Sequence, residues 1–296
     1  MFSRVRPARV AVVTDSTASV PPELVAEHQL TVVPLDVVID GARHVEGEGD
    51  TARLLVEALE AGTSVTTSQS APAAFARAYA QAARAGAREI VSVHLSSELS
   101  GTFRAAELAA LGAPVPVHLV DSRSAGLGLG FAALAAAEAV RELPRRARSE
   151  LAPGAIAAQR ARDVAGTARV FFLVDSLDHL RRGGRLSAAA AALGTVLGMR
   201  PILTLREGRI EVHAKVRTRR AARERLVALA VEAAAGREWP RLAVHHLGQP
   251  ELAAELAAEI AAGVGCEADE VLVSQVSAVI GAHAGPGLLT AVVTDR

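Results

Sequence analysis

The sequence contains very little of several residue types, and each scarcity excludes a class of protein. Cys266 is the only cysteine, which excludes an internal disulfide and a zinc site built from cysteines. Lys215 is the only lysine and it follows Ala214, so the Gly-Lys-Ser/Thr segment of a nucleotide-binding P-loop is missing. No apolar run reaches the roughly 20 residues that a bilayer requires, and no signal-peptide core precedes the first strand-like run. We therefore expect a soluble cytoplasmic protein.

The charge is balanced, because the chain has 32 basic and 32 acidic residues. A balanced chain has no net basic field to attract nucleic acid. Half of its 296 residues are hydrophobic and 22% are charged, which is a globular composition. At about 100–200 residues per domain, this length predicts two domains or one large one.

Short β-branched runs alternate with helical patterns through the first half of the chain. The runs Val10–Val13, Leu35–Ile39, Ile90–Leu95 and Val115–Val120 are typical of strands. Helical patterns occupy residues 51–59, 72–85, 101–111 and 126–141. Because parallel strands need helical crossovers, we predict a three-layer α/β/α domain with a mainly parallel sheet.

The pattern changes near residue 160. Ile202–Leu205 and Ile210–Val216 flank Arg206-Glu207-Gly208-Arg209, which predicts a β-hairpin. A hairpin is antiparallel, so it cannot belong to a purely parallel sheet. We predict an α/β domain over residues 1–160 and an α+β domain with a mixed sheet over residues 161–296.

Hydroxyl side chains gather at two loops of the first predicted domain. Thr66-Thr67-Ser68-Gln69-Ser70 precedes Pro72, and Ser96-Ser97-Glu98-Leu99-Ser100 follows a strand. Ligands of open α/β sheets bind beyond the carboxyl ends of strands, and hydroxyls with free N–H groups bind carboxylate or phosphate. The same residue types are the preferred N-caps of helices. The pattern therefore leaves both a helix cap and an anion site open.

His283 lies in Gly281-Ala282-His283-Ala284-Gly285-Pro286-Gly287, which we predict as a glycine-rich loop between two strands. Glycines let the backbone turn tightly and approach a ligand closely. His283 is therefore either a ligand contact or a structural hydrogen-bond donor. None of the nine histidines has a metal-binding spacing, so we predict no metal site and no catalytic metal.

Two further segments have alternative interpretations. Gly126-Leu127-Gly128-Leu129-Gly130 lacks the dinucleotide-binding spacing, so these glycines indicate close helix packing or a helix wall thinned to admit a bulky group. The basic segments Arg181-Arg182-Gly183-Gly184-Arg185 and Val216-Arg217-Thr218-Arg219-Arg220 are either solvated helix ends or contacts for a phosphate-bearing ligand or an acidic partner.

Several motifs together resemble the DegV family of bacterial fatty-acid-binding proteins. They occur in family order: Val13-Thr14-Asp15-Ser16-Thr17, Thr66-Thr67-Ser68-Gln69, Leu95–Thr102, Val120-Asp121-Ser122, Leu177–Leu186, Met199-Arg200-Pro201, Val216-Arg217-Thr218 and Gly281-Ala282-His283. Each motif is short, but the set spans nearly the whole chain.

The resemblance implies a non-catalytic carrier that holds one long-chain fatty acid in a buried tunnel between two domains, without a cofactor. It places Thr66, Ser97 and His283 on the fatty-acid carboxylate, with Ser96 and Thr67 close by. It also implies delivery to a separate kinase subunit resembling dihydroxyacetone kinase, which makes an acyl-phosphate, and it assigns Arg217 to that partnership. Membrane contact would be transient at most.

From the tunnel that the resemblance implies, we expect the helices that start near Pro72 and Gly126 to face it. The expected lining residues are Phe75, Phe131, Gly126 and Gly281. Two other hypotheses remain: a stand-alone phosphatase or phosphotransferase that uses Asp15 or Asp121, and a lipid-responsive regulator that acts through a protein partner.

Overall fold

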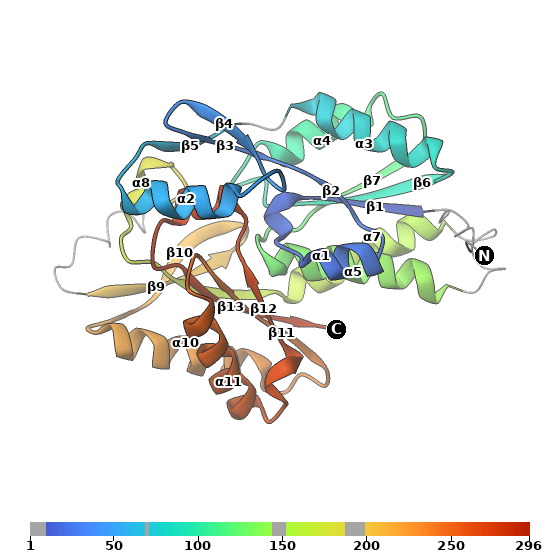
Figure 1. Ribbon diagram of the computed structural model, residues 1–296. Coiled ribbons are helices and arrows are strands. Elements are labelled where there is room, and N and C mark those ends of the chain that lie inside the picture. Colours follow the sequence, from blue (N-terminus) through green and yellow to red (C-terminus); the bar gives the residue numbers. More distant parts are fainter. Residues whose placement is uncertain (1–9, 69–70, 144–151, 187–198) are drawn as a thin grey trace, which may run out of the picture.

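The computed structural model describes residues 10–68, 71–143, 152–186 and 199–296, and three sheets organise them (Figure 1). A four-stranded parallel sheet and a six-stranded mixed sheet form two lobes, and a small antiparallel sheet lies beside them. The predicted combination of an α/β/α part with a parallel sheet and an α+β part with a mixed sheet is confirmed.

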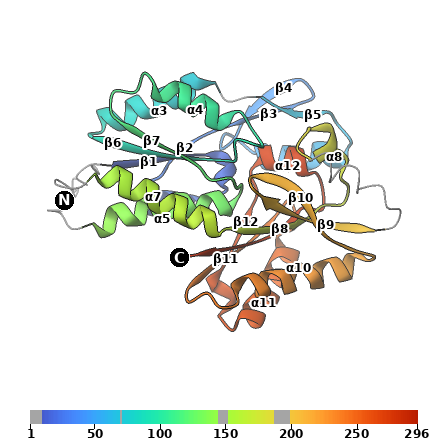
Figure 2. The ribbon, with the colours of Figure 1, turned by 180° about the vertical axis from the view of Figure 1, so that it is seen from behind.

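The parallel sheet has the order β2 (Thr31–Val33), β1 (Val10–Asp15), β6 (Glu89–His94) and β7 (Val117–Asp121). Helices α3 (Pro72–Arg84) and α4 (Thr102–Ala110) cover one face, and α5 (Leu127–Glu142) and α7 (Pro153–Thr167) cover the other (Figure 2). Alternate residues of β1 divide between these faces: Val13 packs with α3 and α4, whereas Val12 packs with α5 and α7. This two-residue period is why the strands are hydrophobic throughout.

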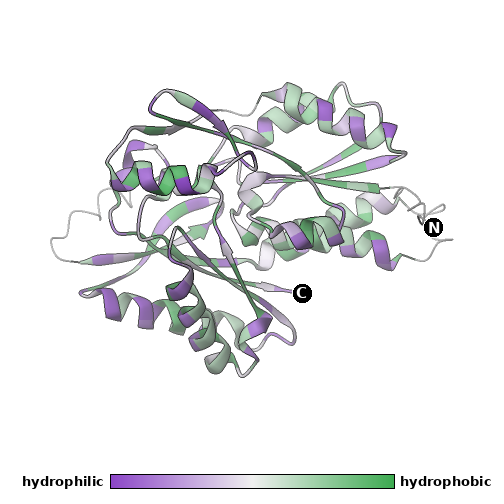
Figure 3. Cartoon of the chain, viewed as in Figure 1, coloured by the Kyte–Doolittle hydropathy of each residue, from purple (hydrophilic) through white to green (hydrophobic). Residues whose placement is uncertain are grey.

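The six-stranded sheet has the order β10 (Arg209–Val216), β9 (Arg200–Arg206), β8 (Arg169–Leu173), β13 (Leu289–Asp295), β11 (Pro240–His246) and β12 (Val271–Gln275). Only β11 and β12 pair in parallel; every other neighbour is antiparallel. The predicted hairpin is formed by β9 and β10. Helices α10 (Arg219–Ala234) and α11 (Pro250–Val264) pack on the outer face, and Figure 3 shows hydrophilic residues interspersed along α10.

The small sheet consists of β4 (Ala42–Val45), β3 (Asp36–Ile39) and β5 (Val65–Thr67). Helices α2 (Thr51–Glu60) and α12 (Ala278–Ala284) lie against it and against each other. The described residues also form four short helices: η1 (Ser16–Ala18), α1 (Pro22–Glu27), α8 (Asp178–Arg182) and η2 (Ala268–Glu270). Segments more than 200 residues apart in the chain therefore meet at α12.

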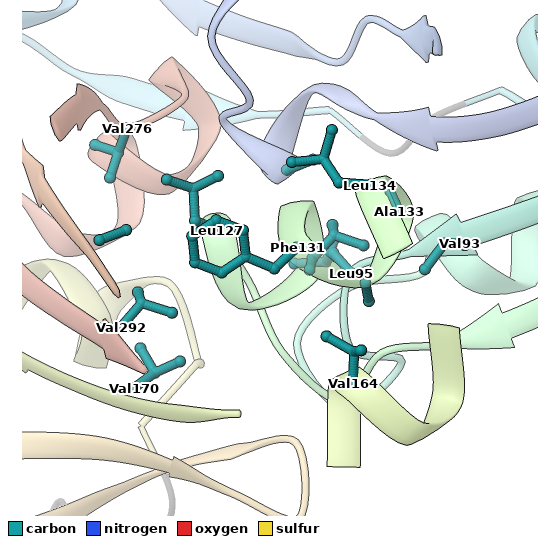
Figure 4. Packing of buried hydrophobic residues seen from close by; sticks show 14 of the residues in the cluster. Val93, Leu95, Leu127, Phe131, Ala133, Leu134, Val164, Val170, Val276 and Val292 are labelled. Carbon is teal, nitrogen blue, oxygen red and sulfur yellow. The ribbon is translucent and has the colours of Figure 1, made fainter. Parts of the chain in front are cut away.

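One hydrophobic cluster joins the two lobes. It contains Val93 and Leu95 from the parallel sheet, Leu127 from α5, and Val170 and Val292 from the inner face of the mixed sheet (Figure 4). Helix α7 crosses residue 160, the predicted domain boundary, and packs on α5 and the parallel sheet. The first strand of the mixed sheet begins directly after it, at Arg169. The two-domain division stays a prediction.

The predicted loop around His283 is wrong, because this residue lies on helix α12. Ser277 caps the helix by accepting a hydrogen bond from the Ile280 N–H at 3.1 Å. Gly281 packs so closely that an added Cβ would lie 2.7 Å from Leu55. That glycine serves helix packing, and Gly285, with φ of 77°, ends the helix.

Candidate functional site

A cavity opens where the three sheets meet. Its empty volume is about 1040 Å³, part of which is continuous with solvent. The parallel-sheet side contributes Leu35, Leu95, Leu99 and Ala125, and the mixed sheet contributes Val170, Phe172, Leu205, Ile210 and Leu288. Helices α8 and α12 and the loop before α12 add Leu180, Val276, Val279, Ile280 and Ala284. The wall is therefore mainly aliphatic, which suits a hydrocarbon chain.

Polar groups gather at one end of this cavity. The Thr67 hydroxyl and the His283 Nε2 atom lie 2.9 Å apart, although 216 residues separate them in the sequence. Ser68, Ser100 and Arg185 also line the cavity. We call Thr67, Ser68, Ser100, Arg185 and His283 the polar end.

Burial and the neighbouring Arg185 charge lower the pKa of His283 to about 4, so its imidazole is neutral at pH 7. A neutral imidazole has one N–H, and the Thr67 hydroxyl has one O–H. Whichever of the two groups donates across the 2.9 Å contact, the other retains a hydrogen. The pair can therefore donate to a ligand.

Arg185 gives the polar end its charge. Its Nε donates to the Leu99 carbonyl at 3.0 Å and a second nitrogen donates to the Gly183 carbonyl. A guanidinium has five N–H donors, so further donors are left for a ligand. None of the described residues that line the cavity is acidic, and Arg185 alone among them carries a fixed charge. The lining therefore suits a ligand with an anionic group at one end and an apolar chain.

His245 connects the two lobes within the cavity wall. Its Nε2 accepts a hydrogen bond from the Leu127 N–H at 2.8 Å, and its Nδ1 lies 3.1 Å from the Ser274 carbonyl. Burial lowers the pKa of His245 to about 4, so the ring stays neutral and can accept this bond. An added Cβ on Gly126, whose φ is 58°, would lie 2.8 Å from Nε2. The glycine at the start of α5 thus makes room for the His245 ring.

The predicted carboxylate residues do not all reach the polar end. Thr67 pairs with Val37, whose side chain is fully buried, so Thr67 points inward on β5. Its neighbour Thr66 points outward and is exposed. The exposed Ser97 hydroxyl donates to Asp121 at 2.6 Å, and the buried Ser96 hydroxyl donates to the Gly208 carbonyl at 2.8 Å. The structure therefore brings Thr67 and His283 together and holds Thr66, Ser96 and Ser97 elsewhere.

Of the four residues predicted to line a tunnel, Gly126 lies in the cavity wall. Phe75 is buried on the far side of the parallel sheet, where its ring packs edge-on against His94. Phe131 belongs to the core of α5, with the Arg241 guanidinium 5.8 Å from its ring centre. Gly281 packs against Leu55 and Leu247. Phe75 and Phe131 therefore lie in the core rather than along the cavity, because α3 and α5 pack on the sheets there, and Gly281 lies in the contact between α12 and α2.

Sequence reasoning did not select Arg185 or Ser100 as site residues. In the sequence Arg185 stands within a basic segment and within the family motif Leu177–Leu186, and neither assigns it to a ligand. The available signal was the preceding pair Gly183-Gly184: an added Cβ on Gly183 would lie 2.6 Å from His283 Nδ1, so this turn approaches the site closely. Arg217 is exposed and lines neither this cavity nor its mouth. Gln69 and Ser70 lie outside the described residues.

The two aspartates of the phosphatase hypothesis are occupied by hydrogen bonds. Asp15 is fully buried and accepts from the Thr17 N–H and hydroxyl, His94 Nδ1 and the Leu95 N–H. Asp121 accepts from Ser97 and from the Arg123 N–H at 2.9 Å. Nothing in this arrangement presents a carboxylate to a phosphate ester.

Two features of the described residues bear on other functions. No cluster of three or more His, Cys, Asp or Glu side chains there is arranged to hold a metal ion. Over the same ranges, no helix has both the length and the hydropathy needed to cross a membrane.

The fold and the cavity define a class of protein: a two-lobed α/β protein with an amphipathic ligand cavity between its sheets. Comparison with known proteins is specific. The model of the DegV family, described as a family of uncharacterised proteins, matches residues 9–296. A DegV domain-containing protein of Streptomyces coelicolor is 46% identical over 287 residues, covering 97% of this chain and 99% of that protein. The chain belongs to the DegV family.

Two solved structures share the whole fold. A DegV family protein from Thermus thermophilus, whose structure is described in terms of fatty acid binding, has 36% identity and a TM-score of 0.84 over 97% of this chain and 100% of that one. DegV from Bacillus subtilis, described as a fatty acid binding protein, has 33% identity and a TM-score of 0.84 over 97% and 99%.

Proposed function

We propose that this protein binds a long-chain fatty acid in the cavity and holds its carboxylate at the polar end, without itself catalysing a reaction. The observation that carries the proposal is Arg185, the one charged side chain among the described residues that line the cavity, most of which are aliphatic and none of which is acidic. Fatty acid binding by the Thermus and Bacillus relatives supports it.

The chemistry of the polar end suits a carboxylate. An ionised carboxylate is costly to remove from water unless hydrogen bonds replace its hydration. Arg185 offers charge-assisted bonds, and the Thr67–His283 pair offers a further donor. The aliphatic wall then gains free energy with each buried methylene of the chain, about 0.8 kcal/mol apiece.

Native mass spectrometry of the purified protein tests the proposal. The expected result is a bound species of a few hundred daltons that is released under denaturing conditions and identified as a fatty acid. A delipidated sample should take up oleate at one equivalent but not the corresponding alcohol at the same concentration. Equal binding of the acid and the alcohol would contradict a role for the charged end.

The strand geometry distinguishes two neighbouring threonines. Thr67→Val removes the inward hydroxyl with little change of volume, and we expect it to weaken oleate binding about tenfold, the cost of one hydrogen bond to a charged group. The matched control Thr66→Val changes an outward, exposed side chain and should leave binding unchanged. Titration calorimetry on delipidated protein measures both. The reverse ranking would mean that Thr66, not Thr67, faces the ligand.

We further propose that the loaded protein acts in the cytoplasm and delivers the fatty acid to a separate kinase subunit resembling dihydroxyacetone kinase. Its contact with membranes would be transient. The absence of a P-loop in the sequence is consistent with a kinase on another chain. The exposed Arg217, between β10 and α10, has no hydrogen-bond or ion-pair partner among the described residues and is free to contact that subunit.

Arg217→Ala tests this contact. The variant should remain folded and loaded with fatty acid, yet its acyl-phosphate formation with the cognate kinase should fall about tenfold or more, since a guanidinium fork on a phosphate or carboxylate is lost. Arg220→Ala is the control, because Arg220 is equally exposed but pairs with Glu224. A wild-type rate for Arg217→Ala in the reconstituted assay would leave this residue without a role.

A further inference from the structure

A second cavity lies on the face of the mixed sheet that α10 and α11 cover, beside the first turns of these two helices. Its empty volume is about 700 Å³, part of which is continuous with solvent. Leu173 of β8 and Leu289 of β13 form its floor, whereas their strand neighbours Phe172 and Thr290 line the cavity that contains the polar end. Because neighbouring strand residues point to opposite faces, one sheet separates the two cavities. We call this second cavity the outer cleft.

The described residues that line the outer cleft include three arginines and one carboxylate. The arginines are Arg200 of β9 and Arg219 and Arg223 of α10, and the carboxylate is Asp175. Arg219 and Arg200 approach Asp175 with N–O distances of 3.0 and 3.6 Å. Arg223 also lines the cleft and makes no hydrogen bond or ion pair with any described residue. Three guanidinium groups against one carboxylate leave a local excess of positive charge.

The position of these charges is unfavourable for the helix itself. Arg219 is the first residue of α10, and Arg223 lies about one turn further along. The first turn of α10 contains no acidic residue. The N-terminal end of a helix has a partial positive charge that favours anions and disfavours cations. The first turn of α11, with Gln249 and Leu252, faces the same cleft. An anion bound in the cleft would offset the positive charge that Asp175 leaves uncompensated.

We propose that the outer cleft binds a phosphoryl group, either as inorganic phosphate or as the head of a small phosphate monoester. The planar forks of Arg200, Arg219 and Arg223 match the oxygens of a phosphoryl group, which carries a charge of about −1.5 to −2 at neutral pH. Asp175 then holds two of the arginines in place but opposes the anion. The site is independent of fatty acid binding.

Titration calorimetry with inorganic phosphate and with phenyl phosphate, at constant ionic strength set by chloride, tests the proposal. We expect Arg223→Gln to weaken binding of both about tenfold. Asp175→Asn should strengthen it severalfold, because the opposing carboxylate is removed. The control Arg220→Gln alters a neighbouring arginine that pairs with Glu224 outside the cleft, and it should have no effect.

Similar affinities for the two probes would identify the phosphoryl group alone as the ligand, and tighter binding of phenyl phosphate would identify a monoester. The proposal is overturned if neither probe binds at millimolar concentration, or if Arg223→Gln and Arg220→Gln weaken binding equally. Circular dichroism of each variant establishes that it is folded. If Asp175→Asn does not fold, the Arg223 and Arg220 pair still decides the question.

Discussion

Replacing Arg185 by glutamine is expected to abolish most of the affinity for a fatty acid. The variant removes the fixed positive charge of the cavity, while the aliphatic wall stays intact. A charge-assisted hydrogen bond contributes about 1.5–3 kcal/mol, so the dissociation constant for oleate should rise roughly 10- to 150-fold. The weaker binding of the corresponding uncharged alcohol, measured at higher concentration, should not change, because it does not depend on this charge.

Two further variants make the test specific. Arg182→Gln changes an exposed arginine of α8 three residues away and should bind oleate normally. Arg185→Lys keeps the charge but loses the fork that bonds Leu99 and Gly183, so we expect partial recovery. Displacement of a fluorescent fatty acid measures all of them. If Arg185→Gln bound oleate as well as the wild type, the head group would have to lie elsewhere.

Asp15→Ala should produce the largest loss of stability of any single variant considered. The side chain is fully buried and accepts four hydrogen bonds that tie β1 to Thr17, His94 and Leu95. Alanine leaves these donors buried without an acceptor. We expect the free energy of unfolding to fall by about 3–5 kcal/mol, a large part of the 5–15 kcal/mol that such a protein has.

Urea denaturation followed by circular dichroism measures this effect. Asp163→Ala, on the exposed face of α7, is the control and should change the midpoint little. Asp15→Asn retains an acceptor and should lie between the two. A stable Asp15→Ala protein that had instead lost a phosphatase activity would favour the catalytic hypothesis for this residue.

Local chemistry in the sequence was enough to predict much of the fold. The β-branched runs with helical crossovers predicted the parallel sheet, because only buried strands tolerate such continuous hydrophobicity. The Arg206-Glu207-Gly208-Arg209 turn predicted the β9–β10 hairpin and hence the mixed sheet. For the glycines of residues 126–130 the sequence left close helix packing and a thinned helix wall open; in the structure Gly126 makes room for the His245 ring and Gly130 lies against the Ala18 backbone. The strands, the helical crossovers and the hairpin depend on neighbours in the chain, whereas the glycine contacts are long-range.

The polar end is formed by residues that are distant in the chain. The sequence therefore indicated which loops contribute to it, but not which side chains. Side chains alternate along a β-strand, so Thr66 and Thr67 must point to opposite sides of the sheet. The pairing of Thr67 with Val37 decides which of the two points inward. Arg185 becomes a site residue only because α12 places His283 against Gly183. Phe75 resembles a tunnel residue in sequence and is a core residue in three dimensions. Local propensity sets the elements, whereas long-range packing of α12 against β5 and α8 decides which side chains share the cavity.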